Sequence, residues 1–320
     1  MTARIIGTGV YVPEQIVTNK DLMKFLDTDD AWIQERTGIR ERRISTKEST
    51  VDMATEAAKR AIADAGIKPE ELDIVIVATS TGDKGFPSAA TEVQAAIGAV
   101  NAVAFDITAA CSGFIYGLHI VQGFFQAGMY RTGLIIGAET ISKVLDWTDR
   151  SSCILFGDGS GAAVVRAEET GVIRTLAGSD GTKGHVLSCQ ARSLGNFLTG
   201  TKPELGLMEM DGQEVFKFAV KKVPEIVNQL LTETGTDRNE IQHYVLHQAN
   251  IRILESASKR LKIPMEKIPV NIDRYGNTSA ASIPILLDEM KRDGRLKRGD
   301  KLIMAGFGAG LTWGAALMEW

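Results

Sequence analysis

Cys111 has the sequence setting of a reactive thiol. It follows the short apolar segment VAFDI and begins the segment CSGFIYGLHIVQGFF, which is apolar almost all round. This pattern predicts a strand followed by a buried helix, with Cys111 at the helix N-terminus. Unpaired N–H groups and the helix dipole favour a thiolate there. We therefore expect a nucleophile that attacks carbonyl groups, although a free cysteine is also commonly a small buried hydrophobic residue.

A histidine and an asparagine in the second half of the chain could serve the same chemistry. His247 follows the apolar segment YVL, and Asn277 lies in the turn YGNTSAAS. Cysteine, histidine and asparagine together form a set used in acyl transfer. Each also has an ordinary explanation, since His247 could be a polar residue at a strand end and Tyr-Gly-Asn is favourable turn chemistry.

The other cysteines and histidines lack a comparable setting. We interpret Cys153 and Cys189 as structural, and His119 as a core residue of the helix after Cys111. His185 and His243 have no supporting context, and no Cys/His pair has zinc-finger spacing. An odd number of cysteines argues against a disulfide framework. We expect neither disulfides nor a bound metal.

A glycine-rich segment, AGFGAGLTWG, runs from Ala305 to Gly314 after the last apolar strands. Glycines allow a ligand to approach the backbone closely, and backbone N–H groups there could stabilise an oxyanion. A phosphate-binding loop is a weaker interpretation, because the chain has no G-x-x-x-x-G-K-[ST] pattern.

Short apolar runs alternate with helical patterns along the chain, which indicates an α/β protein with largely parallel sheets. The apolar runs predict strands at residues 74–77, 103–107, 133–136, 162–165 and 301–305. The helical patterns cover residues 51–65, 89–97, 215–232 and 251–261.

The chain also repeats itself, because three pairs of similar segments occur in the same order. Their offsets are 169 residues (Gly66 and Gly235), 167 (Asp106 and Asp273) and 168 (Leu134 and Leu302). This predicts two duplicated halves, residues 1–170 and 171–320, rather than two unrelated α/β segments. Ligands in such sheets bind beyond the carboxyl ends of the strands, so the duplication places Cys111, His247 and Asn277 at one crevice.

Composition excludes several classes of protein. The 320 residues carry a net charge of -4, which argues against nucleic-acid binding, and no apolar run reaches the length of a membrane span. The opening residues MTARIIGTGVYVP resemble a strand and lack the features of a signal peptide. We expect a cytoplasmic enzyme that binds neither nucleic acid nor membrane.

From about residue 4 to residue 320 the chain resembles the β-ketoacyl-[acyl-carrier-protein] synthase III family, the condensing enzymes that initiate bacterial fatty-acid synthesis. The resemblance rests on the motifs DTDDAWIQERTGIRERR, AACSG, LDWTDR, LFGDGSGAAVV, HQANIRI, YGNTSAASIP and GFGAGLTWG. It implies the thiolase-like fold, a five-layered αβαβα arrangement of two duplicated halves, which agrees with the repeat.

The resemblance also implies a reaction. A short acyl-CoA primer, acetyl-CoA or similar, acylates Cys111, and malonyl-[acyl-carrier-protein] then loses CO₂ and attacks the acyl-cysteine to give a 3-oxoacyl product. His247 and Asn277 would donate hydrogen bonds to the malonyl thioester oxygen, so His247 should be neutral and protonated at Nε2. No metal or redox cofactor is implied.

The amides of Cys111 and Ala309 would hold the oxyanion of the acylation step. The family commonly has GFGGG where this chain has GFGAG. Alanine keeps the N–H but is comfortable only at negative φ. If Ala309 had a positive φ, a neighbouring residue would take this role.

The resemblance assigns further contacts by position. CoA would meet Trp32, Arg36 and Arg150, although Trp32 and Arg36 could instead have a surface capping role. The acidic carrier protein would meet Gln248, Ala249, Asn250, Ile251, Arg252 and Lys217. Phe307 would line the acyl pocket, and Phe86 would close it from the second subunit of a homodimer, which favours a short primer.

Three alternatives stay open. One is a related acyltransferase or priming synthase of secondary metabolism, another is a papain-like cysteine hydrolase with the same Cys, His, Asn order, and the last is a non-catalytic carrier-binding protein. The sequence does not determine whether the primer is acetyl, propionyl or branched.

Overall fold

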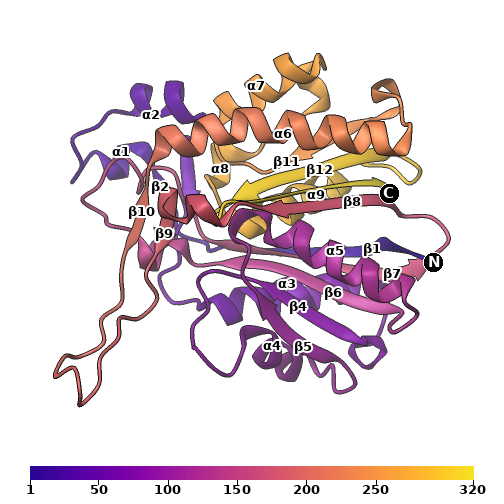
Figure 1. Cartoon of the computed structure of the whole chain (residues 1–320), viewed down its shortest axis with the longest axis horizontal. Coiled ribbons are helices and arrows are strands. Elements are labelled where there is room, and N and C mark those ends of the chain that lie inside the picture. The colour runs from indigo at the N-terminus through magenta and orange to yellow at the C-terminus, as the bar shows by residue number, and fades with distance from the viewer.

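Two β-sheets, one from each half of the chain, form the frame of the structure, a computed structural model that describes residues 1–320 (Figure 1). The first sheet has the order β1-β7-β6-β4-β5 and consists of β1 (Thr2–Tyr11), β4 (Ile74–Ala78), β5 (Val103–Ile107), β6 (Thr132–Glu139) and β7 (Gly159–Glu168). The second has the order β11-β12-β13-β8 and consists of β8 (Val172–Ser179), β11 (His243–Leu246), β12 (Lys301–Gly308) and β13 (Thr312–Glu319).

The two sheets repeat one topology. In the first, β4 pairs with β6 in parallel, and β6, β7 and β1 then pair antiparallel. In the second, β11, β12, β13 and β8 repeat these three pairings in the same order. The chain passes from one sheet to the other between Glu168 and Val172, and the division expected after residue 170 falls in this connection. The second half has no strand equivalent to β5.

The prediction of largely parallel sheets is wrong, because both sheets are mixed. Only β4 with β5, β4 with β6 and β11 with β12 pair in parallel. A fully buried antiparallel strand is as continuously apolar as a buried parallel one, so the hydrophobic pattern did not reveal strand direction.

Helices cover both outer faces and fill the space between the sheets (Figure 1). The outer helices are α3 (Thr50–Ala65) and α4 (Ala89–Ile97) on the first sheet, and α6 (Gly212–Thr234) and α7 (Ile251–Leu261) on the second. The central helices are α5 (Gly113–Gln126) and α9 (Ser282–Arg292). The arrangement is the αβαβα thiolase-like fold, as expected.

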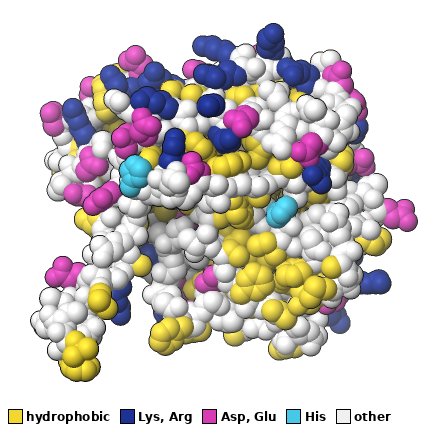
Figure 2. Space-filling model, in the orientation of Figure 1, with side chains coloured by type: hydrophobic (Ala, Val, Ile, Leu, Met, Phe, Trp, Pro, Cys, Tyr) yellow, Lys and Arg dark blue, Asp and Glu magenta, His cyan; other side chains and the backbone are white.

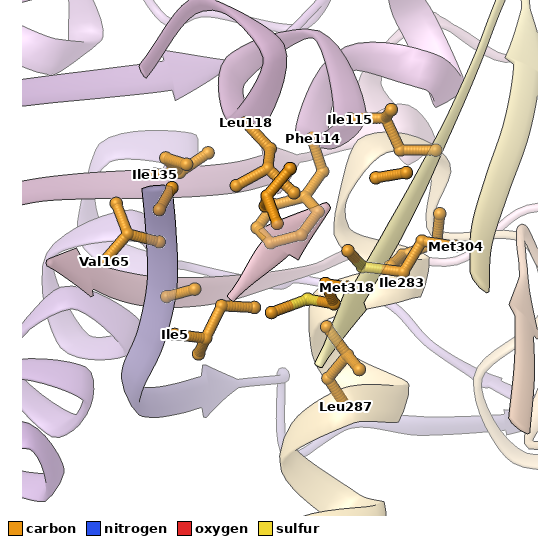
Figure 3. Packing of buried hydrophobic residues seen from close by; sticks show 14 of the residues in the cluster. Ile5, Phe114, Ile115, Leu118, Ile135, Val165, Ile283, Leu287, Met304 and Met318 are labelled. Atoms are coloured by element: carbon orange, nitrogen blue, oxygen red, sulfur yellow. The ribbon is translucent and has the colours of Figure 1, made fainter. Parts of the chain in front are cut away.

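The largest apolar cluster lies between the sheets, around α5 and α9 (Figure 3). Phe114 and Leu118 of α5 point toward Ile135 of the first sheet, whereas Ile115 points toward the second (Figure 3). Burial of each such side chain contributes about 1.5–3 kcal/mol. The central cluster thus holds both halves against the helix that follows Cys111.

Short elements complete the chain at its surface. They are β2 (Ile16–Thr18), α1 (Asn19–Leu22), α2 (Asp30–Thr37), β3 (Glu41–Arg43), β9 (Leu187–Cys189), β10 (Met208–Met210) and α8 (Ile272–Tyr275). Strands β9 and β10 pair antiparallel, and the segment between them extends away from the body of the molecule (Figure 1). Several of its apolar side chains are exposed, among them Leu194, Phe197 and Leu198.

The predicted bounds of α4, α7 and β5 agree with the structure, but α6 is longer at both ends than residues 215–232. The side chain of Asp211 accepts hydrogen bonds from the N–H groups of Gln213 and Glu214, and Gly235 ends the helix in the left-handed conformation. Side-chain capping and a terminal glycine set these limits, which the apolar period alone does not mark.

Helix α5 is not buried all round, and the interpretation of His119 as a core residue is wrong. His119 is exposed and lies 2.6 Å from the Thr175 hydroxyl through its Nδ1. Ile120 and Phe124, on the same side, are only partly buried. Because the exposed side of α5 is also largely apolar, the sequence pattern predicted a fully buried helix. None of the helices combines the length and the hydropathy needed to cross a lipid bilayer.

Candidate active site

One cavity lies at the carboxyl ends of the central strands and brings both halves of the chain together. It encloses about 640 Å³, including its open mouth. Cys111, His247 and Asn277 all line it, so the duplication argument correctly placed them together. Most of the remaining wall is apolar and consists of Leu155, Phe156, Leu187, Met210, Val215, Phe216, Ile253, Phe307 and Leu311.

Cys111 lies in the short 3-10 helix η2 (Ala110–Ser112), two residues before α5 begins at Gly113. Its neighbour Ala110 has a φ of +46°, a conformation that costs a non-glycine residue about 1 kcal/mol. Ser112 ties this turn to the last hairpin, because its hydroxyl lies 2.7 Å from that of Thr312. The Thr312 hydroxyl donates to the Ala109 carbonyl oxygen at 3.0 Å. These contacts fix the nucleophile turn against the second half.

Burial dominates the electrostatics of Cys111. It raises the pKa of the Cys111 thiol to about 12, the Ser279 hydroxyl lowers the pKa, and the Glu139 carboxylate raises it further. The sequence predicted only the favourable effect of the helix N-terminus and missed the burial. The free thiol is therefore protonated at neutral pH and must lose its proton when it attacks.

His247 lies directly after β11, and its backbone N–H donates to the Ala305 carbonyl oxygen at 2.9 Å. Its Nδ1 lies 2.7 Å from the Ser282 hydroxyl, whereas its buried Nε2 has no hydrogen-bond partner. Burial lowers the pKa of His247 to about 3, so the imidazole is neutral at neutral pH. If the Ser282 hydroxyl donates to Nδ1, Nε2 carries the proton and can donate to a ligand in the cavity.

The neutral state of His247 predicts sensitivity of the fold to acid. Because its pKa is about 3 when folded and 6.5 ordinarily, the unfolded chain binds more protons below pH 6.5. The stabilisation is therefore complete above pH 6.5 and is lost as the pH falls toward 3. We expect this group alone to lower the free energy of unfolding by on the order of 4 kcal/mol.

Urea unfolding of the wild type and of His247→Gln at about pH 7.5, 5.5 and 4.5 measures this loss. These pH values span the range in which an ordinary histidine takes up its proton. The wild type should lose more stability than the variant as the pH falls. Equal losses in the two proteins would show that His247 is not held neutral by the fold.

Asn277 is fixed by its backbone and by its side-chain oxygen. Its N–H donates to the Leu155 carbonyl oxygen at 2.8 Å, and its own carbonyl oxygen accepts from Gly157 N at 3.0 Å. Its Oδ1 accepts from Ser279 N at 2.9 Å. The Nδ2 group makes no hydrogen bond within the chain and is left to donate to a ligand.

The glycine-rich segment forms the hairpin between β12 and β13, so its first residues belong to a strand rather than following one. A Cβ atom at Gly308 would lie 2.6 Å from the backbone nitrogen of Cys111, so only glycine fits there. Ala309, the next residue, is not among the residues with positive φ. The condition for an alanine in the GFGAG segment, a φ that is not positive, is therefore met. Ala309 follows Gly308, which lies against the Cys111 amide.

The residues expected to bind CoA cluster at the surface around α2. The guanidinium carbon of Arg36 lies 4.9 Å from the centre of the Trp32 ring, and that of Arg150 lies 5.5 Å from it. Arg150 also forms an ion pair with Asp27 at 3.8 Å. The Arg36 carbonyl oxygen accepts from Asn250 Nδ2 at 3.0 Å, which links this cluster to the cavity wall.

The expected carrier-protein contacts divide into inner and outer residues. Gln248 is buried: its Nε2 donates to the Leu246 carbonyl oxygen at 2.8 Å, and its Oε1 accepts from Asn271 N at 3.1 Å. Its side chain therefore faces inward, and its role at the carrier-protein surface stays a prediction. Ala249 and Asn250 line the cavity, and Ile251 packs on the α6–α7 side of the second sheet.

Arg252 and Lys217 are exposed, as a docking role requires. Arg252 lies 5.7 Å from the ring of Phe216, a wall residue of the cavity, and makes no ion pair. Lys217 pairs with Glu214 at 2.8 Å. Figure 2 shows lysine and arginine side chains gathered over α6 and α7.

The two phenylalanines assigned to the acyl pocket lie in different environments. Phe307 is buried, lines the cavity and packs edge-on against the His247 ring with the centroids 5.5 Å apart. Phe86 is 90% exposed and does not line the cavity within one chain. Its assignment requires a second subunit.

Sequence reasoning missed the residues that support the site from behind. Ser279 and Ser282, in the NTSAAS segment, hold Asn277 and His247, and Glu139 binds Ser279. The position of Glu139 at the end of the strand LIIGAE was the available signal. Of the cysteines interpreted as structural, Cys153 is buried but Cys189 is exposed.

Comparison with known proteins identifies the family of the chain. The family model 3-oxoacyl-[acyl-carrier-protein] synthase III matches residues 105–181, and its C-terminal model matches residues 231–320. The chain is 49% identical to β-ketoacyl-[acyl-carrier-protein] synthase III of Clostridium acetobutylicum, covering 100% of this chain and 99% of the relative. It is 52% identical to the same enzyme of Caldanaerobacter subterraneus subsp. tengcongensis, covering 100% and 98%.

Solved structures have the same fold as this chain. The fold matches 3-oxoacyl-[acyl-carrier-protein] synthase III of Aquifex aeolicus with a TM-score of 0.92 at 46% identity, covering 99% of this chain and 100% of that one. It also matches the priming β-ketosynthase of the R1128 polyketide pathway with a TM-score of 0.92, at 34% identity and with 99% and 96% covered.

Proposed function

The chain belongs to the β-ketoacyl-[acyl-carrier-protein] synthase III family, and from that premise we propose which residues carry out the condensation. It is an acyltransferase of fatty-acid synthesis that condenses an acyl primer with malonyl-[acyl-carrier-protein]. The observation that carries the assignment of residues is the single cavity lined by Cys111, His247 and Asn277.

In the first half-reaction, the Cys111 sulfur attacks the carbonyl carbon of an acyl-CoA. The bond to the CoA sulfur breaks, and CoA leaves. The amides of Cys111 and Ala309 bind the oxyanion of this step, which the close approach of Gly308 to Cys111 N supports. The apolar wall surrounds the acyl chain and excludes water from the resulting thioester.

In the second half-reaction, His247 Nε2 and Asn277 Nδ2 donate to the thioester oxygen of the malonyl group. These two hydrogen bonds stabilise the enolate that forms as CO₂ leaves. The enolate carbon attacks the acyl-cysteine, releases the Cys111 sulfur and gives the 3-oxoacyl product. Both donors are free of partners within the chain, which supports this assignment.

The same cavity must receive two substrates, and its rim supports separate contacts for each. Acyl-CoA would place its adenine against Trp32 and its phosphates near Arg36 and Arg150. The carrier protein, which is acidic, would dock on the basic surface over α6 and α7, with Arg252 beside the mouth (Figure 2).

These separate contacts predict reciprocal effects. Trp32→Ala should raise the KM for acyl-CoA about tenfold, since loss of a stacked aromatic costs about 1–2 kcal/mol, and should leave the KM for malonyl carrier protein unchanged. Arg252→Glu should raise the KM for malonyl carrier protein and leave the KM for acyl-CoA unchanged. Steady-state kinetics with each substrate varied in turn measures both constants. An equal change in both KM values for either variant would contradict the separation of the two contacts.

We propose a homodimer as the working assembly. Strand β5 is an edge of the first sheet, and partly buried Phe105, Ile107, Ile120 and Phe124 line the adjoining face of β5 and α5. Figure 2 shows this face as an apolar patch. Such a patch commonly marks a protein interface, and a second copy would bring its exposed Phe86 to the neighbouring acyl pocket.

Introduction of charge should break this assembly. Phe124→Asp places a carboxylate in the patch, where a dimer would have to bury it unpaired. Sedimentation equilibrium should give twice the chain mass for the wild type and a single chain for the variant, which should also lose condensation activity. A wild type that sediments as a monomer would refute the dimer.

We also propose that the enzyme is cytoplasmic and needs no metal or redox cofactor. Its three cysteines are free, which suits a reducing compartment. Neither half-reaction uses a metal or redox cofactor, because thiol, imidazole and amide groups supply the contacts that both steps need. Full activity after dialysis against a strong chelator, and recovery of the protein in the cytosolic fraction, are the results expected.

A priming synthase of secondary metabolism is the second candidate, favoured by the similarity to the R1128 enzyme. A panel of acyl-CoAs of different length and branching, with acylated protein weighed and CO₂ release from malonyl carrier protein measured, separates the two. Condensation with a short primer and a fatty-acid carrier protein supports the main assignment. Acylation without CO₂ release would favour pure acyl transfer.

A further inference from the structure

Glu139, the last residue of β6, is a fully buried carboxyl group that forms no ion pair. Its oxygens accept hydrogen bonds from Ser80 N at 3.1 and 3.2 Å, from the Thr81 hydroxyl, and from the Ser279 hydroxyl at 3.1 Å. A carboxyl group is costly to bury without an opposite charge. The two half-reactions described above give it no task, so its place behind the cavity needs a separate explanation.

Ser279 joins Glu139 of the first half to the second half of the chain. Its φ is +50°, in the left-handed region, where a residue with a side chain is strained by about 1 kcal/mol. The next residue, Ala280, lies directly on β6, because a Cβ atom at Gly137 would be 2.2 Å from the Ala280 carbonyl oxygen. The hydrogen bond from the Ser279 hydroxyl to Glu139 therefore holds a strained residue in a tightly packed turn.

The backbone of Ser279 determines which end of the Asn277 amide faces the cavity. Its N–H donates to Asn277 Oδ1 at 2.9 Å. A backbone N–H group can only donate, so the amide cannot turn over without placing its own NH₂ group against another donor. Asn277 Nδ2 is thus left free of partners within the chain, in a residue that lines the cavity.

Only the side chain of Asn277 depends on Ser279. Its backbone is held separately, by hydrogen bonds to Leu155 at 2.8 Å and from Gly157 at 3.0 Å. The second donor of the site also has its own support, because His247 Nδ1 lies 2.7 Å from the Ser282 hydroxyl. Loss of the contact between Glu139 and Ser279 should therefore free one amide group and leave the rest of the site in place.

We propose that Glu139 is a positioning residue for the decarboxylation step. By holding the Ser279 hydroxyl, it keeps the Ser279 N–H directed at Asn277 Oδ1 and so presents Asn277 Nδ2 to the malonyl thioester oxygen. This inference rests on the proposed role of Asn277 as a donor to that oxygen. Glu139 and Ser279 touch neither substrate, and no bond to either is made or broken.

The role requires an acceptor rather than a charge. Burial raises the pKa of the Glu139 carboxyl to about 7. In either protonation state one oxygen keeps lone pairs for the Ser279 hydroxyl. Glutamine also has one acceptor oxygen and a similar shape, so Glu139→Gln should keep the positioning. Methionine has a similar length but no such acceptor, so Glu139→Met should lose it.

The test is single-turnover CO₂ release from malonyl carrier protein by full-length protein that has first been acylated with acetyl-CoA, so that the acylation rate does not enter. Ser279→Ala and Glu139→Met should each lower the rate about tenfold, the effect of one lost hydrogen bond. Glu139→Gln should stay within about threefold of the wild type. Thr8→Val is the matched control, because it removes a buried hydroxyl that donates to Asp288 at 2.7 Å and does not line the cavity.

A double-mutant cycle with Asn277→Asp separates positioning from general damage. Aspartate keeps the oxygen that accepts from Ser279 N but has no donor to position. Ser279→Ala should therefore lower CO₂ release by less than about twofold when it is added to Asn277→Asp. A further loss as large as in the wild type would show that Ser279 acts independently of Asn277 and would overturn the proposal.

Ser279→Gly tests whether the hydroxyl acts by holding the strained turn. It removes the same hydroxyl as Ser279→Ala, but glycine adopts a positive φ without strain, so it should lose less CO₂ release. Equal losses in the two variants would mean that the hydroxyl acts on another group. A loss in Glu139→Gln as large as in Glu139→Met would mean that the charge matters, and would also contradict the proposal. If Glu139→Met does not fold, the two Ser279 variants decide the question.

The proposed function can fail independently. Wild-type CO₂ release in Asn277→Asp would refute Asn277 as a donor to the malonyl group. Reduced release in Asn277→Asp, combined with wild-type release in folded Ser279→Ala, would refute only the positioning role of Glu139.

Discussion

Cys111→Ala should abolish acyl-enzyme formation and lower condensation by at least about 10⁴-fold, the scale on which loss of a nucleophile acts in triad enzymes. The reason is chemical, since no other thiol lines the cavity: Cys153 is buried elsewhere and Cys189 is exposed on β9. The change removes only one sulfur atom from a buried turn, so the fold should persist.

Intact mass after incubation with acetyl-CoA measures this directly. Cys153→Ala and Cys189→Ala are matched controls, and both should gain the mass of one acetyl group as the wild type does. Retained acylation of Cys111→Ala, with its thermal unfolding unchanged, would show that the acyl group is carried by a different residue.

His247→Ala and Asn277→Asp should each lower CO₂ release from malonyl carrier protein about 10²- to 10³-fold, the usual effect of removing one donor to a developing oxyanion. Aspartate at position 277 keeps the oxygen that accepts from Ser279 N but loses the Nδ2 donor. It therefore tests the donor and leaves the local fold in place. The losses should combine less than additively, because the two donors bind one oxygen.

The rate of Cys111 acylation is the control for these variants. Neither donor acts on the acyl-CoA carbonyl oxygen, so acylation by acetyl-CoA should remain within about tenfold of the wild type, roughly 1.4 kcal/mol. Acylation that falls as far as CO₂ release would show that His247 acts on the thiol itself.

Much of the fold was predictable because it depends on local patterns. The apolar period located α4, α7 and β5, and the repeated segments indicated two halves. Strand direction was not predictable, since it depends on how β7 and β13 return beside their neighbours. Helix limits such as Asp211 at α6 needed the capping geometry.

The sequence by itself determined that Cys111, His247 and Asn277 follow strands in two repeated halves, and hence that they share a crevice. Residue type and position along the chain carry that information. Burial and the direction of side chains do not follow from them. Only the tertiary structure decided that Gln248 faces inward, that the Cys111 thiol is protonated, and that Glu139 accepts a hydrogen bond from the Ser279 hydroxyl. The Glu139–Ser279 contact joins segments more than a hundred residues apart, brought together by packing of η7 (Ser279–Ala281) against β6, and Gln248 is held inside by Leu246 and Asn271.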